Sequence, residues 1–160
     1  MRRYPLILTF TYTVDGDGYA ARVTGGTRLL AHHADGECVC SAVSFGGLES
    51  RGATLGDAHE PFLAEIRAIV LESASGFAFA EFEREVLDIA GTLDPEVADC
   101  WSEALEEFRR GALAADGMEK LRRIRESDIP PVAVQLLTAP GVVHEIRTEL
   151  TIPMTQSRVA

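Results

Sequence analysis

The chain has 160 residues, of which 46% are hydrophobic and 25% are charged, and its formal net charge at pH 7 is -10. This composition predicts one packed domain, or a small domain with an appendage, and excludes wholesale disorder. It contains no apolar run near the ~20 residues that cross a bilayer. Its acidic balance disfavours nucleic acid as a partner, because binding to phosphates depends on clustered Lys and Arg.

The N-terminal segment and the cysteines indicate the compartment. After the two arginines that follow Met1, threonines alternate with apolar residues, and no small-residue cleavage site follows. This pattern is typical of a strand and not of a signal peptide. Three cysteines form an odd, sparse set, which argues against a disulfide framework and for a reducing compartment. We therefore expect a cytoplasmic protein without a membrane segment.

The first 45 residues are predicted to form an antiparallel meander. Apolar residues alternate with polar ones from Leu6 to Val14, which is the period of a strand. Asp15 to Gly18 and the pair Asp35-Gly36 are turn signals, since glycine and aspartate accept the positive φ that tight hairpins require. Gly25-Gly26 is predicted to break the chain between strands. The four expected strands cover residues 6–14, 19–23, 27–33 and 38–45.

A helix is predicted after the turn that contains Gly47 and Gly52. Thr54 has the side chain of an N-cap, and Asp57 completes a weak capping box with it. Two starts remain open because proline removes a hydrogen bond from a helix interior. Either the helix begins at Thr54 and is kinked at Pro61, or it begins near residue 59 with the proline in its tolerant first turn. The second alternative is favoured.

The second half of the chain is predicted to be mainly helical. Amphipathic spacing indicates helices over residues 77–90, over 94–110 with Asp94 as N-cap and Pro95 at the first helical position, and over 117–126. Pro130 and Pro131 end the last of these. Period-two alternation returns over 143–153, and this late strand is expected to join an edge of the first sheet. We therefore predict an α+β fold, with a β-β-β-β-α unit at 1–73 and a helical appendage at 74–160 that packs on it.

Residues 27–72 resemble HicB-like antitoxin domains. The family pattern is an Asp-Gly turn, a strand, a glycine-containing turn, a Gly-x-Thr helix start and an amphipathic helix that ends in Leu-Glu. The matching residues are Asp35, Gly36, Val39, Ala42, Gly47, Leu48, Gly52, Thr54, Leu55, Ala58, Ile66, Leu71 and Glu72. The chain departs from the family where Val43 and Gly46 replace the turn prolines, where Pro61 interrupts the helix, and in two extra strands before the unit.

The resemblance implies a protein that binds another protein. Such domains resemble small nuclease-like folds without catalysis, and they neutralise a basic RNA-cleaving toxin; many also carry a C-terminal DNA-binding module. The acidic charge suits a basic toxin. The residues after Phe77 do not resemble a ribbon-helix-helix or a helix-turn-helix, and they are acidic as well, so DNA binding is not expected from this chain. The resemblance implies no cofactor.

Three side chains are candidate metal ligands. If Asp35-Gly36 form a two-residue turn, His33 lies opposite Cys38, and both share a face with Cys40. Three ligands are one short of a closed tetrahedral zinc site. The alternative, which we favour, has both cysteines as small buried hydrophobic residues.

An apolar stripe on the 94–110 helix is the candidate interface. Trp101, Leu105 and Phe108 recur at helical spacing. Core packing is the first interpretation, and a dimer or partner interface, for which Trp and Phe are suited, is the second. The same helix carries a run of glutamates, interpreted first as a solvated face. Four basic residues at 120–125 are too few to indicate nucleic-acid binding.

No catalytic motif is present: the sequence lacks a nucleophile elbow, a His-Glu-x-x-His zinc motif, a phosphate-binding loop and a dinucleotide fingerprint. We therefore expect a non-catalytic binding protein of the HicB type. Two alternatives remain. One is a stand-alone homo-oligomer, such as a homodimer, with an accessory or scaffold role. The other is a metal-dependent hydrolase that uses His33, Cys38 and Cys40.

Overall fold

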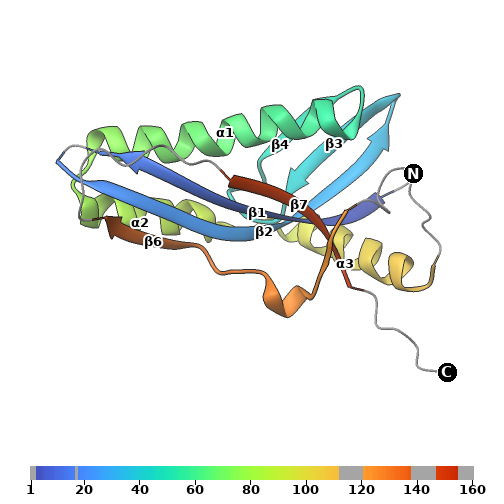
Figure 1. The fold of residues 1–160 in the computed structure, drawn as a ribbon. Helices are drawn as coiled ribbons and strands as arrows, with labels where there is room; N and C mark the ends of the chain where they lie inside the picture. The colour runs from blue at the N-terminus through green and yellow to red at the C-terminus, as the bar shows by residue number, and fades with distance from the viewer. Residues whose placement is uncertain (1–2, 17, 112–120, 138–146, 155–160) are drawn as a thin grey trace.

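The computed structural model describes residues 3–16, 18–111, 121–137 and 147–154, and these form an α+β fold. One mostly antiparallel sheet of seven strands is packed by three helices (Figure 1). The strands are β1 (Arg3–Asp15), β2 (Ala20–Ala34), β3 (Glu37–Ala42), β4 (Glu49–Gly52), β5 (Arg123–Ile124), β6 (Ala133–Leu137) and β7 (Arg147–Pro153). The helices are α1 (Leu55–Gly76), α2 (Phe79–Ala90) and α3 (Pro95–Arg109).

The sheet is built around the long hairpin of β1 and β2. The strand order is β4-β3-β2-β1-β7-β5, and β6 pairs with β2 along the part of its edge that β3 leaves open. The late strand predicted over 143–153 is confirmed over its described part, because β7 pairs antiparallel with β1 from Ile7↔Thr151 to Thr11↔Arg147. The C-terminal half of the chain therefore completes the sheet that the N-terminal half begins.

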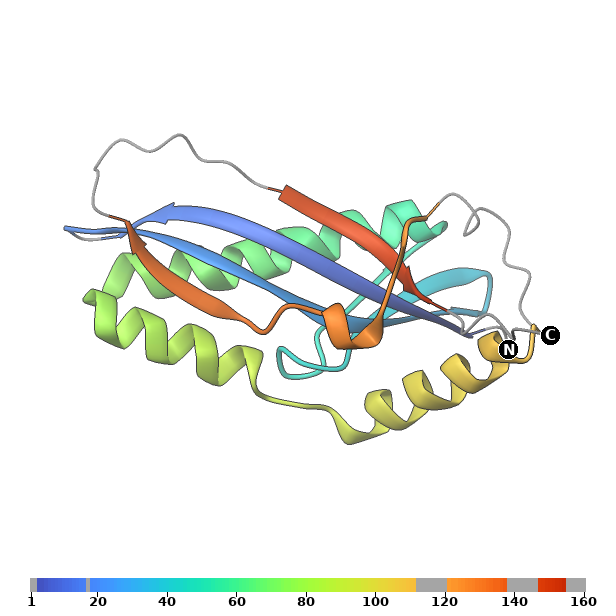
Figure 2. The same ribbon diagram turned by 60° about the horizontal axis from the view of Figure 1, so that its bottom comes forward.

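The predicted break at Gly25-Gly26 is wrong, because β2 runs through both glycines. A segment that we call the crossing segment, residues 123–137, starts beside β7, passes over β1 and β2 and joins β2 as β6 (Figure 2). A Cβ on Gly26 would lie 2.8 Å from Cγ2 of Ile129, and a Cβ on Gly25 would lie 2.8 Å from Cα of Val132. These glycines therefore admit a close neighbour and do not end a strand.

Three further elements differ from the prediction. β4 and β6 were not expected. Within the region 117–126, which was predicted to be helical, the described residues form the two-residue strand β5 and the start of a 3₁₀ helix, Glu126–Asp128. Residues 117–120 lie outside the described part of the chain. β5 pairs in parallel with β7 at Arg123↔Ile152, so this segment extends the sheet.

Helix α1 begins earlier than the favoured alternative. Thr54 is its N-cap, its Oγ1 accepts the N–H of Asp57 at 3.2 Å, and Pro61 lies inside the helix. Proline at this place removes the bond to the carbonyl of residue 57, four positions earlier. The alternative in which the helix begins near residue 59 is therefore wrong, and the helix continues through the proline.

Both halves of the chain share the same core. Alternate residues of β1, from Leu6 to Val14, face α1 and α2 and form the larger cluster with Phe62, Phe82 and residues of β7 such as Ile152. On the other face of the sheet, Ile7 and Leu30 pack against Trp101 of α3 in a second cluster. The indole N–H of Trp101 donates to the backbone oxygen of Leu6 at 2.9 Å. α3 is therefore fixed to β1 by a buried hydrogen bond as well as by apolar contact.

Candidate functional site

The three candidate metal ligands lie at the end of the β2–β3 hairpin. The predicted register is present: His33 is opposite Cys38, and Ala31 is opposite Cys40. The two thiols are buried, whereas His33 is exposed. Its ring makes an edge contact with the ring of Tyr4, with 6.2 Å between the ring centroids. Burial raises the pKa of the Cys40 thiol to about 12 and also raises that of Cys38. Both thiols are therefore protonated in the metal-free protein, and a metal ion would have to displace their protons.

The described residues contain no group of three or more His, Cys, Asp or Glu side chains placed to hold a metal ion. The three cysteines are free thiols. The described part of the chain therefore offers no donor set that fits a zinc centre.

The predicted turn and cap residues lie where the chain changes direction. Asp35 and Gly36 have φ values of 54° and 79°, which makes a two-residue turn with both residues left-handed. Gly47 has a φ of 73°, and a Cβ there would lie 2.6 Å from a carboxylate oxygen of Asp94, the N-cap of α3. Gly52 is required for another reason: a Cβ would lie 2.4 Å from the carbonyl carbon of Asp57. Gly47 and Gly52 thus allow α3 and α1 to approach the sheet closely, and Asp35-Gly36 form the β2–β3 turn.

The candidate interface residues of α3 are inside the protein. Trp101, Leu105 and Phe108 are 1%, 5% and 9% exposed, and all three contribute to the packing between α3 and the sheet. Their stripe therefore presents no surface to a partner in this structure.

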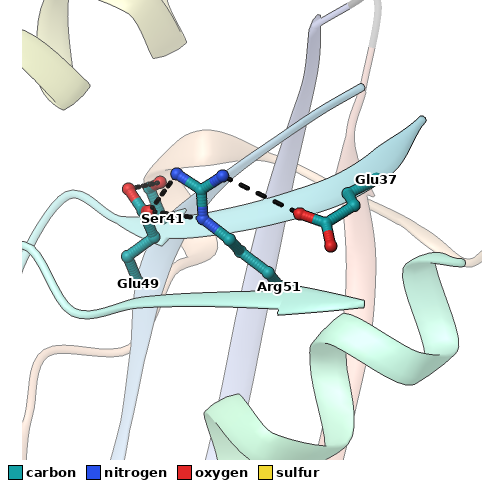
Figure 3. Close-up of polar contacts among 4 residues, drawn as sticks. All are labelled: Glu37, Ser41, Glu49 and Arg51. Atoms are coloured by element: carbon teal, nitrogen blue, oxygen red, sulfur yellow. Dashed lines mark hydrogen bonds and ion pairs between the residues drawn. The ribbon is translucent and has the colours of Figure 1, made fainter. Parts of the chain in front are cut away.

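A cluster of polar side chains lies on β3 and β4 (Figure 3). The guanidinium of Arg51 lies between two carboxylates, with Nη2 at 3.1 Å from Glu49 and Nη1 at 3.8 Å from Glu37. The hydroxyl of Ser41 donates to the second oxygen of Glu49 at 3.4 Å. These groups satisfy one another at an exposed edge of the sheet, where ion pairs add little stability.

This cluster has residue types used in nucleophilic catalysis, but its geometry does not support that chemistry. His32 lies on the neighbouring strand, and burial lowers its pKa, against the opposing effect of Glu49. A catalytic serine donates its proton to a histidine. Here the hydroxyl of Ser41 is directed to a carboxylate instead. The side chains of this cluster also lie outside the two cavities beside the crossing segment.

Two open cavities flank the crossing segment. The larger, about 660 Å³, is lined mainly by threonines of β1, β2 and β7, with Pro130 and Glu149. The smaller, about 390 Å³, lies on the other side of Pro130 and includes Arg28 and Glu126. The carboxylates in both are already paired: Arg122 lies 2.6 Å from Glu149 and lowers its pKa, and Arg28 lies 3.1 Å from Glu126. Neither cavity offers an activated nucleophile or base.

The strongest chemical feature of the molecule is the charge of its helices. Residues 55–110, which contain α1, α2 and α3, hold 14 of the 25 acidic residues and four of the 15 basic ones. Their formal charge of -10 equals that of the whole chain. All other residues of the chain sum to zero, so the net charge lies with the three helices, α1 and α2 on one face of the sheet and α3 on the other. A charge count by element would have found this segregation in the sequence.

Comparison with known proteins adds no family assignment. The chain matches no protein-family model, no curated protein and no solved structure. Among the described residues, no helix combines the length and hydropathy needed to cross a membrane.

Proposed function

We propose that this protein is a non-catalytic binding module of the HicB type, which neutralises a small basic RNA-cleaving toxin in the cytoplasm. The observation that carries the proposal is the segregation of the net charge of -10 onto residues 55–110, which contain the three helices. A one-signed surface attracts a partner of opposite sign and accelerates its association. The resemblance of residues 27–72 to HicB-like domains supports the same role.

The chemistry of the interior is consistent with binding and offers no support for catalysis. Within the described residues, the buried cysteines are protonated and the glutamates of the two cavities are held in ion pairs. The polar cluster of β3 and β4 is internally satisfied. A binding role needs none of these groups to react, and it uses the helical surface that the core leaves free.

Expression of the partner tests the proposal. The proposal expects a gene for a small basic protein beside the gene for this chain, and that protein is induced in a bacterial host, alone and together with this chain. Alone it should arrest growth and cleave cellular RNA, and co-expression should restore growth. The purified complex should dissociate as salt is raised from 50 mM to 500 mM, because screening weakens attraction between exposed charges.

Two results would overturn the proposal. One is a genomic neighbourhood that encodes no small basic protein. The other is a neighbouring protein that arrests growth equally with and without this chain. In either case, light scattering on the purified chain would test the remaining hypothesis of a stand-alone homo-oligomer, which should then exceed the 17.3 kDa of one chain.

A further inference from the structure

Several carboxylates of α3 form ion pairs within the chain. Arg3 of β1 lies 2.9 Å from Glu103 and 3.3 Å from Glu107, and these pairs attach the helix to the sheet. Glu106 pairs with Arg109 of the same helix at 3.1 Å. Three of the five acidic residues of α3 are therefore engaged, and the field of this helix is partly neutralised.

The carboxylates of α1 and α2 are not engaged in this way. Eight acidic residues lie on these helices: Asp57, Glu60, Glu65, Glu72, Glu81, Glu83, Glu85 and Asp88. None of them forms an ion pair with a described residue. The two helices carry only two basic residues, Arg67 and Arg84. Eight acidic residues against two basic ones thus concentrate negative charge on these helices.

Large apolar side chains are exposed on the same two helices. Leu71 of α1 and Leu87 of α2 are each 40% exposed. Leu87 follows Arg84 by three positions, and the exposed residues Glu81, Arg84 and Asp88 share one side of α2. An exposed leucine beside unpaired carboxylates has the composition of a protein contact, in which an apolar centre excludes water and charged residues surround it.

From the unpaired carboxylates and the exposed leucines we infer that the basic partner docks on α1 and α2 and not on α3. We call the exposed residues of these two helices, which include Leu71, Leu87, Glu81 and Asp88, the α1–α2 surface. This inference rests on the proposed function. The occupant is a protein with clustered Arg or Lys that face the unpaired carboxylates and with apolar groups that cover Leu71 and Leu87. Charge complementarity selects this surface, because α3 has already used most of its carboxylates within the chain.

Matched charge variants test the location. Glu81→Gln with Asp88→Asn removes two charges from α2, and Glu96→Gln with Asp99→Asn removes two from α3. Each pair includes one first-turn glutamate, so the loss of helix-dipole stabilisation is similar. The probe is the small basic protein encoded beside this chain. The α2 pair should lower its association rate constant about threefold to tenfold, and the α3 pair less than twofold.

Leu87→Ser tests the apolar part of the contact. The rate constant for dissociation of this variant from the basic protein should rise roughly tenfold, because loss of a buried apolar contact acts mainly on dissociation. Leu93→Ser is the control, since Leu93 is 64% exposed but lies between α2 and α3; it should leave the rate unchanged. Circular dichroism and the emission of Trp101 establish that each variant is folded.

The outcomes separate the two proposals. If the wild-type chain binds and the α3 pair slows association as much as the α2 pair, the α1–α2 surface is wrong while the proposed function stands. An unchanged dissociation rate for Leu87→Ser would likewise contradict it. If the wild-type chain does not bind the basic protein, both the proposed function and this surface are refuted.

Discussion

Trp101 and Tyr12 are buried aromatic residues with polar atoms, and their environments predict opposite responses to substitution. The indole N–H of Trp101 satisfies the backbone oxygen of Leu6. Trp101→Phe leaves that buried oxygen without its donor and creates a small void, so the free energy of unfolding should fall by about 2–4 kcal/mol. Chemical denaturation followed by circular dichroism measures this loss.

A control isolates the buried hydrogen bond of Trp101. Arg28 lies over the indole at 5.2 Å and pairs with Glu126 at the surface. Arg28→Ala removes the contact with the indole face and the surface ion pair but leaves the indole N–H bonded, and it should cost about 1 kcal/mol. If Arg28→Ala were as costly as Trp101→Phe, the buried bond would not be the main contribution.

Tyr12 is the contrasting case. Its side chain is buried, and its hydroxyl has no hydrogen-bond partner among the described residues. Tyr12→Phe removes a polar atom that the folded state leaves unsatisfied, so stability at pH 7 should stay unchanged or rise by about 1 kcal/mol. A loss greater than that in urea denaturation would show that the hydroxyl is bonded in solution.

The same residue contributes to a predicted loss of stability at alkaline pH. Burial raises the pKa of Tyr12 from 10.0 to about 12 and that of Cys40 from 9.0 to about 12. In the unfolded chain both groups release their protons near their ordinary values, whereas the folded protein keeps them. The unfolded state then binds fewer protons, so stability is complete below pH 9 and falls as pH rises towards 12. Urea midpoints from pH 8 to 11 should fall less steeply for Tyr12→Phe and for Cys40→Ala than for the wild type.

At the scale of elements, the crossing segment packs so closely on β2 that its side chains leave room only for glycine at position 26. A Cβ on Gly26 would meet Ile129, Pro130 at 3.1 Å and the backbone oxygen of Leu8 at 3.3 Å. Gly26→Ala should therefore displace the crossing segment and speed hydrogen exchange in β6, while α1 stays protected. In the double variant with Ile129→Ala, most of the protection should return, because the shortened side chain leaves room. Equal exchange in the single and double variants would contradict this account.

The elements that the sequence predicted well are those whose hydrophobic pattern repeats over many residues. β1, α2, α3 and the described part of β7 repeat their pattern over enough residues to identify the element. β4 was missed because Glu-Ser-Arg-Gly has no apolar alternation and is a strand only through its pairing with β3. The same holds for β5, whose two residues are defined by β7.

A glycine pair was one source of error in local interpretation. In the sequence, a pair such as Gly25-Gly26 is equally compatible with a break and with close approach by a distant segment. The distinction depends on Ile129 and Val132, which lie more than a hundred positions away. For the candidate site, the His33–Cys38 register followed from the turn, but the burial that keeps the thiols protonated depends on how the whole sheet is packed.

At the scale of the whole molecule, the two predicted domains do not have separate interiors. The larger core contains residues of β1, β2 and α1 together with Phe82, Phe108 and Ile152 from the second half. β7 pairs with β1, and β6 with β2, so both strands of the central hairpin need the second half of the chain to complete their hydrogen bonds. A fold with one interior of this kind is expected to unfold as one unit.

Three observables test this expectation in the complete chain. Trp101, the single tryptophan, reports α3, and circular dichroism reports the whole. In a Cys100→Ser background, which removes the partly exposed third thiol, the reaction of Cys38 and Cys40 with a thiol reagent reports the β3 side of the core. Because these regions share one sheet, their urea midpoints should coincide, with one slope. If Trp101 became exposed at lower urea while the two thiols stayed protected, α3 would be a separately folding appendage. The matched charge variants of α3 would then act on a detachable helix, and their value as controls for the α1–α2 surface would be lost.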